Sequence, residues 1–144
     1  MISVKPPENF QPIFEVVACL LEQAGEILLL HRQSHKNQPN TWGLPAGKVE
    51  TGESREQALA REIFQETGFT VDLNQPKHII TRNVRYPEFD FVYHMYHLSL
   101  TIRPTIQINL GEHQASQWVS PNRALELNLI LDLPDCLRLY YNLP

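Results

Sequence analysis

The stretch GKVETGESREQALAREIFQETGF, residues 47–69, predicts a helix with a glycine-containing lead-in. Ser54 is a favourable N-cap residue, and Gln57 three positions later completes a capping box of the S-x-x-Q form. Gly68 fits the left-handed residue that ends many helices. We therefore expect a helix over residues 55–67.

The spacing of the residues within this helix separates an apolar row from an acidic row. Residues four apart share a face, and four apolar side chains are expected to point to the core: Leu59, Ala60, Ile63 and Phe64. Glu62 and Glu66 lie one turn apart on the adjacent row, where like charges repel by about 0.2–0.5 kcal/mol. A divalent cation would favour such paired oxygen donors, and Mg²⁺ binds through one or two carboxylates plus phosphate and water. The alternative is an ordinary solvated helix face.

The stretch resembles the signature of the Nudix hydrolase family, G-x5-E-x7-R-E-apolar-x-E-E-x-G-apolar. The fixed positions that match are Gly47, Glu53, Arg61, Glu62, Ile63, Glu66, Gly68 and Phe69. One position departs from the pattern, because Gln65 replaces the first acid of the E-E pair. The preceding residues 42–46, WGLPA, are also similar to the lead-in found in this family.

The resemblance implies hydrolysis of a diphosphate linkage in a nucleoside diphosphate joined to another group, with Mg²⁺ as the cofactor and Mn²⁺ as the alternative. It implies that Glu62 and Glu66 are metal ligands and that Arg61 orients a carboxylate through a charge-assisted hydrogen bond. Bound metal ions would neutralise the diphosphate and lower the pKa of an attacking water. This would reconcile an acidic protein with an anionic substrate.

The same resemblance assigns further residues to the site. Glu53 would shape the loop or assist catalysis, and the backbone carbonyl of Gly47 or its neighbour Ala46 would add a metal oxygen. MutT-like members carry a later glutamate ahead of a tryptophan-containing strand, and Glu112 in GEHQASQW matches it as a metal ligand or general base. The alternative for Glu112 is a solvated loop acid. Gln65 carries no charge and puts the full number of bound metal ions in question.

Substrate contacts are expected from residues outside the helix. Arg32 and Lys48 are candidates for phosphate contacts. Tyr86, 17 residues past the signature, resembles a pattern of dinucleoside polyphosphate hydrolases, with ordinary packing as the alternative. Asn128 and Asp132 are candidates for contact with a base.

Composition excludes several other classes of function. The chain of 144 residues has a net charge of −4 and scattered Lys and Arg residues, so neither nucleic acid nor an anionic membrane is an expected partner. No apolar run approaches the length of a membrane span, and the start of the chain does not resemble a signal peptide. His94 and His97 fall in a predicted strand, where residues three apart point to opposite faces and do not chelate one ion. We expect a cytoplasmic monomer or homodimer that binds a small-molecule nucleotide.

The remaining patterns predict an α/β protein with a mixed sheet. Expected strands cover residues 14–21, 26–31, 69–73, 78–84, 90–102 and 116–120, and expected helices cover residues 121–126 and 134–142. The segment TWGLPAG, residues 41–47, is expected to be neither helix nor strand. The order of elements resembles the Nudix α/β/α sandwich, as a single domain over residues 1–144.

The resemblance leaves three kinds of activity open. The short chain favours a MutT-like enzyme that cleaves a nucleoside triphosphate to the monophosphate and pyrophosphate. A dinucleoside polyphosphate hydrolase, suggested by Tyr86, or an ADP-ribose hydrolase is the second possibility. The third is a nucleotide-binding module without catalysis, suggested by Gln65.

Overall fold

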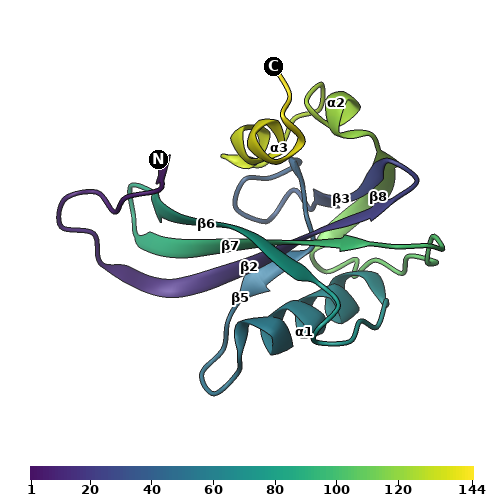
Figure 1. Ribbon diagram of the computed structural model, residues 1–144, viewed down its shortest axis with the longest axis horizontal. Helices are drawn as coiled ribbons and strands as arrows, with labels where there is room; N and C mark the ends of the chain where they lie inside the picture. Colours follow the sequence, from purple (N-terminus) through teal and green to yellow (C-terminus); the bar gives the residue numbers. More distant parts are fainter.

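A mixed sheet with helices on both faces forms the structure, a computed structural model that describes residues 1–144 (Figure 1). The strands are β1 (Ile2–Ser3), β2 (Pro12–Gln23), β3 (Glu26–Arg32), β4 (Trp42–Gly43), β5 (Ala46–Lys48), β6 (Lys77–Arg85), β7 (Asp90–Ser99) and β8 (His113–Val119). The helices are α1 (Arg55–Thr67), α2 (Pro121–Ala124) and α3 (Leu133–Tyr141). The strand order is β1-β6-β7-β2-β3-β4, with β5 paired to β2 and β8 paired to β3. Strands β2 and β7 run parallel, and the other pairs are antiparallel.

Helix α1 begins and ends where its capping residues predict. The backbone N–H of Gln57 donates to Ser54 Oγ at 3.1 Å, and the N–H of Ser54 donates to Gln57 Oε1 at 2.8 Å. Gly68 has a φ of 77°, and its N–H donates to the Phe64 carbonyl at 2.8 Å. These bonds satisfy backbone groups that the helix itself leaves without partners. The predicted helix is confirmed.

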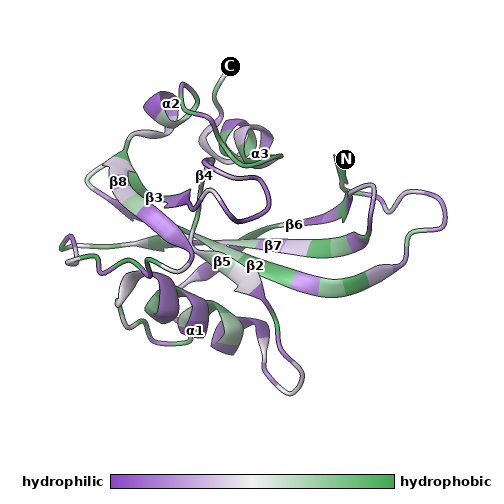
Figure 2. Cartoon of the chain, turned by 180° about the vertical axis from the view of Figure 1, so that it is seen from behind, coloured by the Kyte–Doolittle hydropathy of each residue, from purple (hydrophilic) through white to green (hydrophobic).

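Successive side chains of β2 point to opposite faces of the sheet and so contribute to two cores, one on each face. Val17, Cys19 and Leu21 pack with the buried side of α1. Ala18 and Leu20 pack on the opposite side with α3. All five side chains are essentially inaccessible to solvent, and burial of a side chain as large as leucine contributes about 1.5–3 kcal/mol. Figure 2 shows the resulting hydrophobic colour along much of β2, which holds α1 against one face and α3 against the other.

The expected α/β/α sandwich is confirmed, and several local expectations are corrected. Residues 69–73 do not form a strand, because their backbone pairs with no neighbouring strand, although Val71 is buried against the α1 core. The strand expected to reach residue 102 ends at Ser99, opposite Glu22, one residue before its partner β2 ends at Gln23. Phe64 does not face the core, and its side chain is 56% exposed.

The segment 41–47 was expected to avoid regular structure, and this expectation is wrong at two places. Trp42 and Gly43 pair with β3 as the short strand β4. Ala46 begins β5, which pairs with β2. Pro45, whose nitrogen cannot donate, lies between the two strands, so neither ladder loses a bond. The pairing of β5 fixes the backbone that faces α1.

The strand alternation also separates His94 from His97, as predicted. His94 Nε2 lies 2.8 Å from Glu15 Oε1, on the side of the sheet that α1 covers. His97 Nε2 lies 2.9 Å from Glu22 Oε1, and its ring contacts Tyr140 of α3 on the other side. The two histidines do not form one site. None of the three helices has the length and apolar content that a membrane crossing requires.

Candidate active site

Glu62 and Glu66 lie on the side of α1 that faces β5. Glu66 is almost completely buried, with 4% of its surface exposed, and its Oε2 accepts a hydrogen bond from the Ala46 N–H at 3.1 Å. The Glu62 side chain is 14% exposed. The i, i+4 spacing brings both carboxylates to one wall, as the sequence predicts.

Gly47 allows the backbone of β5 to approach this wall. A Cβ atom at this position would lie 2.1 Å from Cδ of Glu62, which is far inside van der Waals contact. Any larger residue would therefore displace the carboxylate or the strand. A glycine is therefore required at this position by the lack of space for a side chain, and not by its φ angle.

Arg61 links the helix to its lead-in loop through its guanidinium fork. Its Nε and Nη2 donate to the two oxygens of Glu53 at 2.9 and 2.8 Å, and its Nη1 donates to Glu62 Oε1 at 2.7 Å. Nη2 also donates to the carbonyl of Lys48 at 2.9 Å. The bonds from Arg61 are the main cause that lowers the pKa of Glu53 to about 2. Glu53 thus holds Arg61, and Arg61 holds Glu62.

Gln65 lies outside the group of carboxylates. Its side chain is exposed, and its Oε1 accepts a bond from Arg61 Nη1 at 3.3 Å. The residue that departs from the family pattern is therefore oriented by the same guanidinium that orients Glu62. Gln65 does not line the cleft, and Glu62 and Glu66 are held by Arg61 and by the Ala46 N–H without it.

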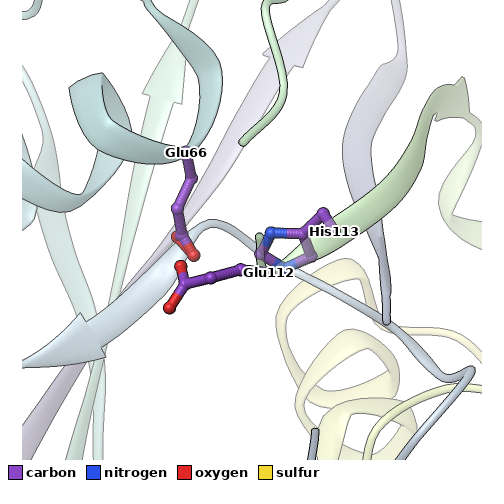
Figure 3. Close-up of side chains that lie close together, drawn as sticks. All are labelled: Glu66, Glu112 and His113. Atoms are coloured by element: carbon purple, nitrogen blue, oxygen red, sulfur yellow. The ribbon is translucent and has the colours of Figure 1, made fainter. Parts of the chain in front are cut away.

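Glu112 and His113 approach Glu66 from the start of β8 (Figure 3). One potential ligand atom from each of the three residues lies within 4.8 Å of the others. Glu112 is 42% exposed at its side chain and pairs with Lys36 Nζ at 3.4 Å. Glu112, predicted from its distance to the tryptophan, therefore lies close to the acids of α1.

The carboxylates of this group repel one another. Burial is the main cause that raises the pKa of Glu66 well above its usual value, and the charges of Glu62 and Glu112 raise it further. Burial also raises the pKa of Glu62, while Arg61 acts in the opposite direction. The carboxylates converge without enough neighbouring positive charge to balance them. Oxygen donors of this kind are the ligands that Mg²⁺ or Mn²⁺ prefers. The residues present fit a divalent cation.

Basic residues border the same cleft. Arg32, Lys36 and Lys48 line it together with the acids. Arg32 Nε donates to the carbonyl of Asn37 at 2.9 Å, which orders the polar loop of residues 34–40. The Lys48 ammonium lies 4.2 Å from the centroid of the Phe14 ring, a contact that orients it beside the cleft. An anionic ligand would meet positive charge at this rim and the carboxylates at its floor.

A largely apolar cavity of about 380 Å³ adjoins the charged cleft. Its aromatic lining comes from β2 and from the hairpin of β6 and β7: Phe14, Tyr86, Phe89, Phe91 and Tyr93. Cavity and cleft share one wall, formed by Arg32, Ala46, Gly47, Lys48, Glu66 and His113. The cavity also contains Asp132, whose Oδ2 is buried without a hydrogen-bond partner.

The structure separates the predicted residues into two groups. Arg32 and Lys48 border both the cleft and the cavity, whereas Tyr86 lines only the cavity. Asp132 lines the cavity, but Asn128 is exposed and lines neither space, which corrects that expectation.

Three residues near these spaces were missed. They are Lys36, His113 and Gln38, whose Oε1 accepts from the Leu131 N–H at 2.7 Å. The only sequence signal for any of them is the position of His113 directly after Glu112.

Comparison with known proteins places this geometry in a family. The family model described as NUDIX domain matches residues 12–140. The chain is 34% identical over 124 residues to the CTP pyrophosphohydrolase of Escherichia coli strain K12, an alignment that covers 85% of this chain and 87% of that protein.

Solved structures show the same arrangement of elements. The MutT protein from Methanosarcina mazei Go1 superposes with a TM-score of 0.80 at 26% identity, over 92% of this chain and 95% of the other. The ORF135 protein of E. coli superposes with a TM-score of 0.76 at 30% identity, over 96% and 95% of the two chains. The sheet, α1 and the late helices therefore occur together in these proteins.

Proposed function

The chain belongs to the Nudix hydrolase family, pyrophosphohydrolases that act on nucleotides with a diphosphate linkage, and we propose that it hydrolyses a nucleoside triphosphate to the monophosphate and pyrophosphate. The proposal treats residues 1–144 as one Nudix domain. It assigns the phosphates to the charged cleft and the base to the apolar cavity.

The observation that carries this proposal is the shared wall between the two spaces. Arg32, Lys48 and Glu66 border both the cleft and the cavity. A nucleotide has the same division, with a flat apolar base at one end and a charged phosphate chain at the other. A ligand whose base occupies the aromatic cavity would place its phosphates against the acids and lysines of the cleft.

In the proposed reaction, water attacks phosphorus and the bond to the pyrophosphate oxygen breaks. Glu62 and Glu66 would hold the divalent cation, with the backbone carbonyl of Gly47 as a further oxygen ligand. When bound, this Mg²⁺ or Mn²⁺ would neutralise phosphate charge and lower the pKa of the attacking water. Glu112, half-exposed beside Glu66, is assigned either to the metal or to the proton that the water loses.

The surrounding residues would position these groups. Arg61 fixes the Glu62 carboxylate, and Glu53 fixes Arg61 through two hydrogen bonds. Lys36, Lys48 and Arg32 would bind phosphate oxygens, both those of the departing pyrophosphate and those of the monophosphate. Charge-assisted hydrogen bonds of this kind are about twice as strong as neutral ones.

Asp132 is the proposed contact to the base. Its Oδ2 is buried without a partner in a largely apolar cavity, so a base with an amino group would satisfy it. The E. coli relative is named a CTP pyrophosphohydrolase, and cytosine carries such an amino group. We therefore take CTP and dCTP as the first substrates to test.

Tyr86 supports a second candidate, a dinucleoside polyphosphate. Its ring contacts Phe89 and Phe91 at centroid distances of 5.8 and 5.2 Å, so the aromatic surface extends along the hairpin. A second base would stack on such a surface. This candidate keeps the same cleft for the phosphate chain and differs only in what occupies the aromatic end.

The experiment measures phosphate and pyrophosphate release from a panel with Mg²⁺ or Mn²⁺. The panel contains the common nucleoside triphosphates, a dinucleoside polyphosphate, ADP-ribose and a nucleotide sugar. Pyrophosphate from a triphosphate, with the monophosphate as the second product, is the expected result. Preference for the dinucleoside polyphosphate would select the second candidate.

Matched variants establish that the activity belongs to this site. Glu66→Gln removes a buried carboxylate of the cleft, and Glu56→Gln removes an exposed carboxylate from the first turn of the same helix. Turnover should vanish in the first variant and persist in the second. Metal-dependent nucleotide binding without turnover of any substrate would instead support a binding module.

A further inference from the structure

His113 has a buried ring nitrogen for which the protein supplies no partner. The residue is 4% exposed, and its Nδ1 is buried and makes no hydrogen bond. A buried polar atom of this kind is uncommon because it loses its bond to water and gains nothing in return. The unmet hydrogen-bonding capacity points to a group that binds at this position.

The direction of the ring identifies where that group would bind. The imidazole lies beside the carboxylates of Glu66 and Glu112 (Figure 3). A ligand atom from each of the three residues falls within 4.8 Å of the others. One ion placed among these atoms would be within reach of all three side chains.

The backbone around His113 is held in place from the neighbouring strand end. The Gln33 N–H donates to the carbonyl of Glu112 at 2.9 Å, and Gln33 Nε2 donates to the carbonyl of His113 at 3.2 Å. The β3–β8 register shifts between His31 and Arg32, so β8 carries an extra residue beside His113. Such irregularities re-aim side chains, and here the strand directs an imidazole to the end of α1.

We propose that His113 is a nitrogen ligand of the divalent cation, which would lie between Glu66 and Glu112. The inference rests on the metal site of the proposed function and adds a residue type that Mg²⁺ rarely selects. Imidazole shifts a site towards the later divalent metals, whose affinity rises from Mn²⁺ to Co²⁺ and Ni²⁺. This nitrogen would add a ligand in a protein that has one carboxylate fewer than the family pattern, because Gln65 replaces an acid.

The experiment uses the full chain with Mn²⁺ and no nucleotide. Pulsed electron paramagnetic resonance detects the magnetic coupling between bound Mn²⁺ and a directly ligating nitrogen. The wild-type protein should show this coupling. Labelling its histidines with ¹⁵N should replace the ¹⁴N coupling pattern by that of ¹⁵N. His113→Gln should lose the coupling and weaken Mn²⁺ and Co²⁺ binding at least about tenfold, with a smaller loss for Mg²⁺.

His35→Gln is the matched control. His35 is an exposed histidine of the adjacent loop, and its Nε2 lies 3.1 Å from the carbonyl of Gly111, the residue before Glu112. This variant should keep the nitrogen coupling and the metal affinities. Circular dichroism of both variants would establish that their folds match that of the wild type.

The outcomes separate this inference from the proposed function. Bound Mn²⁺ without nitrogen coupling, or coupling that persists in His113→Gln, overturns the role of His113 whether or not nucleotides are hydrolysed. Absence of Mn²⁺ binding overturns it as well. Nitrogen coupling in a protein that cleaves no triphosphate would keep the ligand assignment and reject the substrate assignment.

Discussion

The charged cleft and the apolar cavity share a wall, yet they are built in different ways. One wall of the cleft depends on a single helix and its lead-in, because Glu62, Glu66 and the residues Glu53 and Arg61 that position Glu62 all lie within 14 residues of sequence. The cavity draws its lining from β2, the β6–β7 hairpin, the loop of residues 34–40 and the start of α3. The acids of α1 and the residues that hold them are local in sequence, although Arg32, Lys36, Glu112 and His113 reach the cleft from elsewhere in the chain. The lining of the cavity has no such local part.

This difference has a consequence for function. The acids of α1 lie on a helix with both ends capped, and Arg61 cross-links this helix to the lead-in loop. The cavity is bordered by Gln38 and Asp132, two non-glycine residues with positive φ angles of 47° and 71°. The acids of α1 are thus held by regular structure, while the far side of the cavity is formed in part by irregular backbone outside α1. If the cleft binds the phosphates and the cavity the base, as proposed, the base end is the part that could vary without disturbing α1.

The largest effect is expected from Glu66→Gln in the cleft. The variant should reduce kcat/KM by at least about 100-fold, because ligand loss exceeds the roughly 10- to 100-fold effect of residues that only support ligands. Its melting temperature without metal should not fall, since burial already disfavours the charged form of Glu66. Added Mg²⁺ should raise the melting temperature of the wild type and leave the variant nearly unchanged.

Arg61→Lys tests whether the cleft needs the guanidinium fork. Arg61 bonds Glu53, Glu62 and the Lys48 carbonyl at once, and a single ammonium does not reproduce this planar geometry. We expect kcat to fall about 10- to 100-fold, with a smaller change in KM. Arg55→Lys, at an arginine that bonds only one oxygen of Glu15, is the control; equal losses in both variants would reject a positioning role for Arg61.

Local sequence spacing was sufficient for α1 and for the faces of β7. Ser54, Gln57 and Gly68 determine the ends of the helix within a few residues, and the period of two in β7 sends His94 and His97 to opposite faces. Phe64 was misplaced because it lies at the edge of the apolar row, where helix periodicity does not settle burial. The strand at residues 69–73 was misassigned because β propensity does not supply a pairing partner.

The sequence predicts residues of the cleft better than residues of the cavity. The acids of α1 and Glu112 were predicted, because fixed spacing and a nearby tryptophan mark them. Gln38 acts through its bond to the Leu131 backbone, 93 residues away in the chain, and no local pattern indicates such a contact. The buried nitrogen of His113 was also not predictable from the sequence, since its burial depends on the pairing of β8 with β3 and on the nearby Glu66 of α1.

Asp132→Asn tests the cavity without altering the cleft. The Asp132 carboxyl and the replacement amide have nearly the same shape, but they offer different hydrogen-bonding groups. We expect the preference for cytosine over uracil triphosphates to change by about tenfold, with metal affinity unchanged. Asp135→Asn alters an acid of the same helix that is 71% exposed, and it should preserve the preference; a change of metal affinity in Asp132→Asn would contradict the separation of the two spaces.

The smallest effect is expected from Asp90→Asn, which concerns stability and not catalysis. Asp90 accepts bonds from Arg85 Nε at 2.8 Å, Arg85 Nη2 at 3.0 Å and the Gln11 N–H at 2.8 Å, and so braces the hairpin that carries Tyr86. The bonds from Arg85 are the main cause that lowers the pKa of Asp90 from 3.8 to about 2. Its ionised form therefore contributes stability that is fully present above about pH 3.8 and is lost as the pH falls through about 2.

Thermal unfolding at several pH values measures this contribution. At pH 7 Asp90→Asn should melt at a lower temperature than the wild type, and the difference should disappear near pH 2. Glu88→Gln, at the exposed turn of the same hairpin, should show no such dependence. A buried acid of the cleft and a bonded acid of the hairpin would then differ in kind. Burial disfavours the charged form of Glu66, whereas the bonds from Arg85 favour the charged form of Asp90 and stabilise the hairpin that lines the cavity.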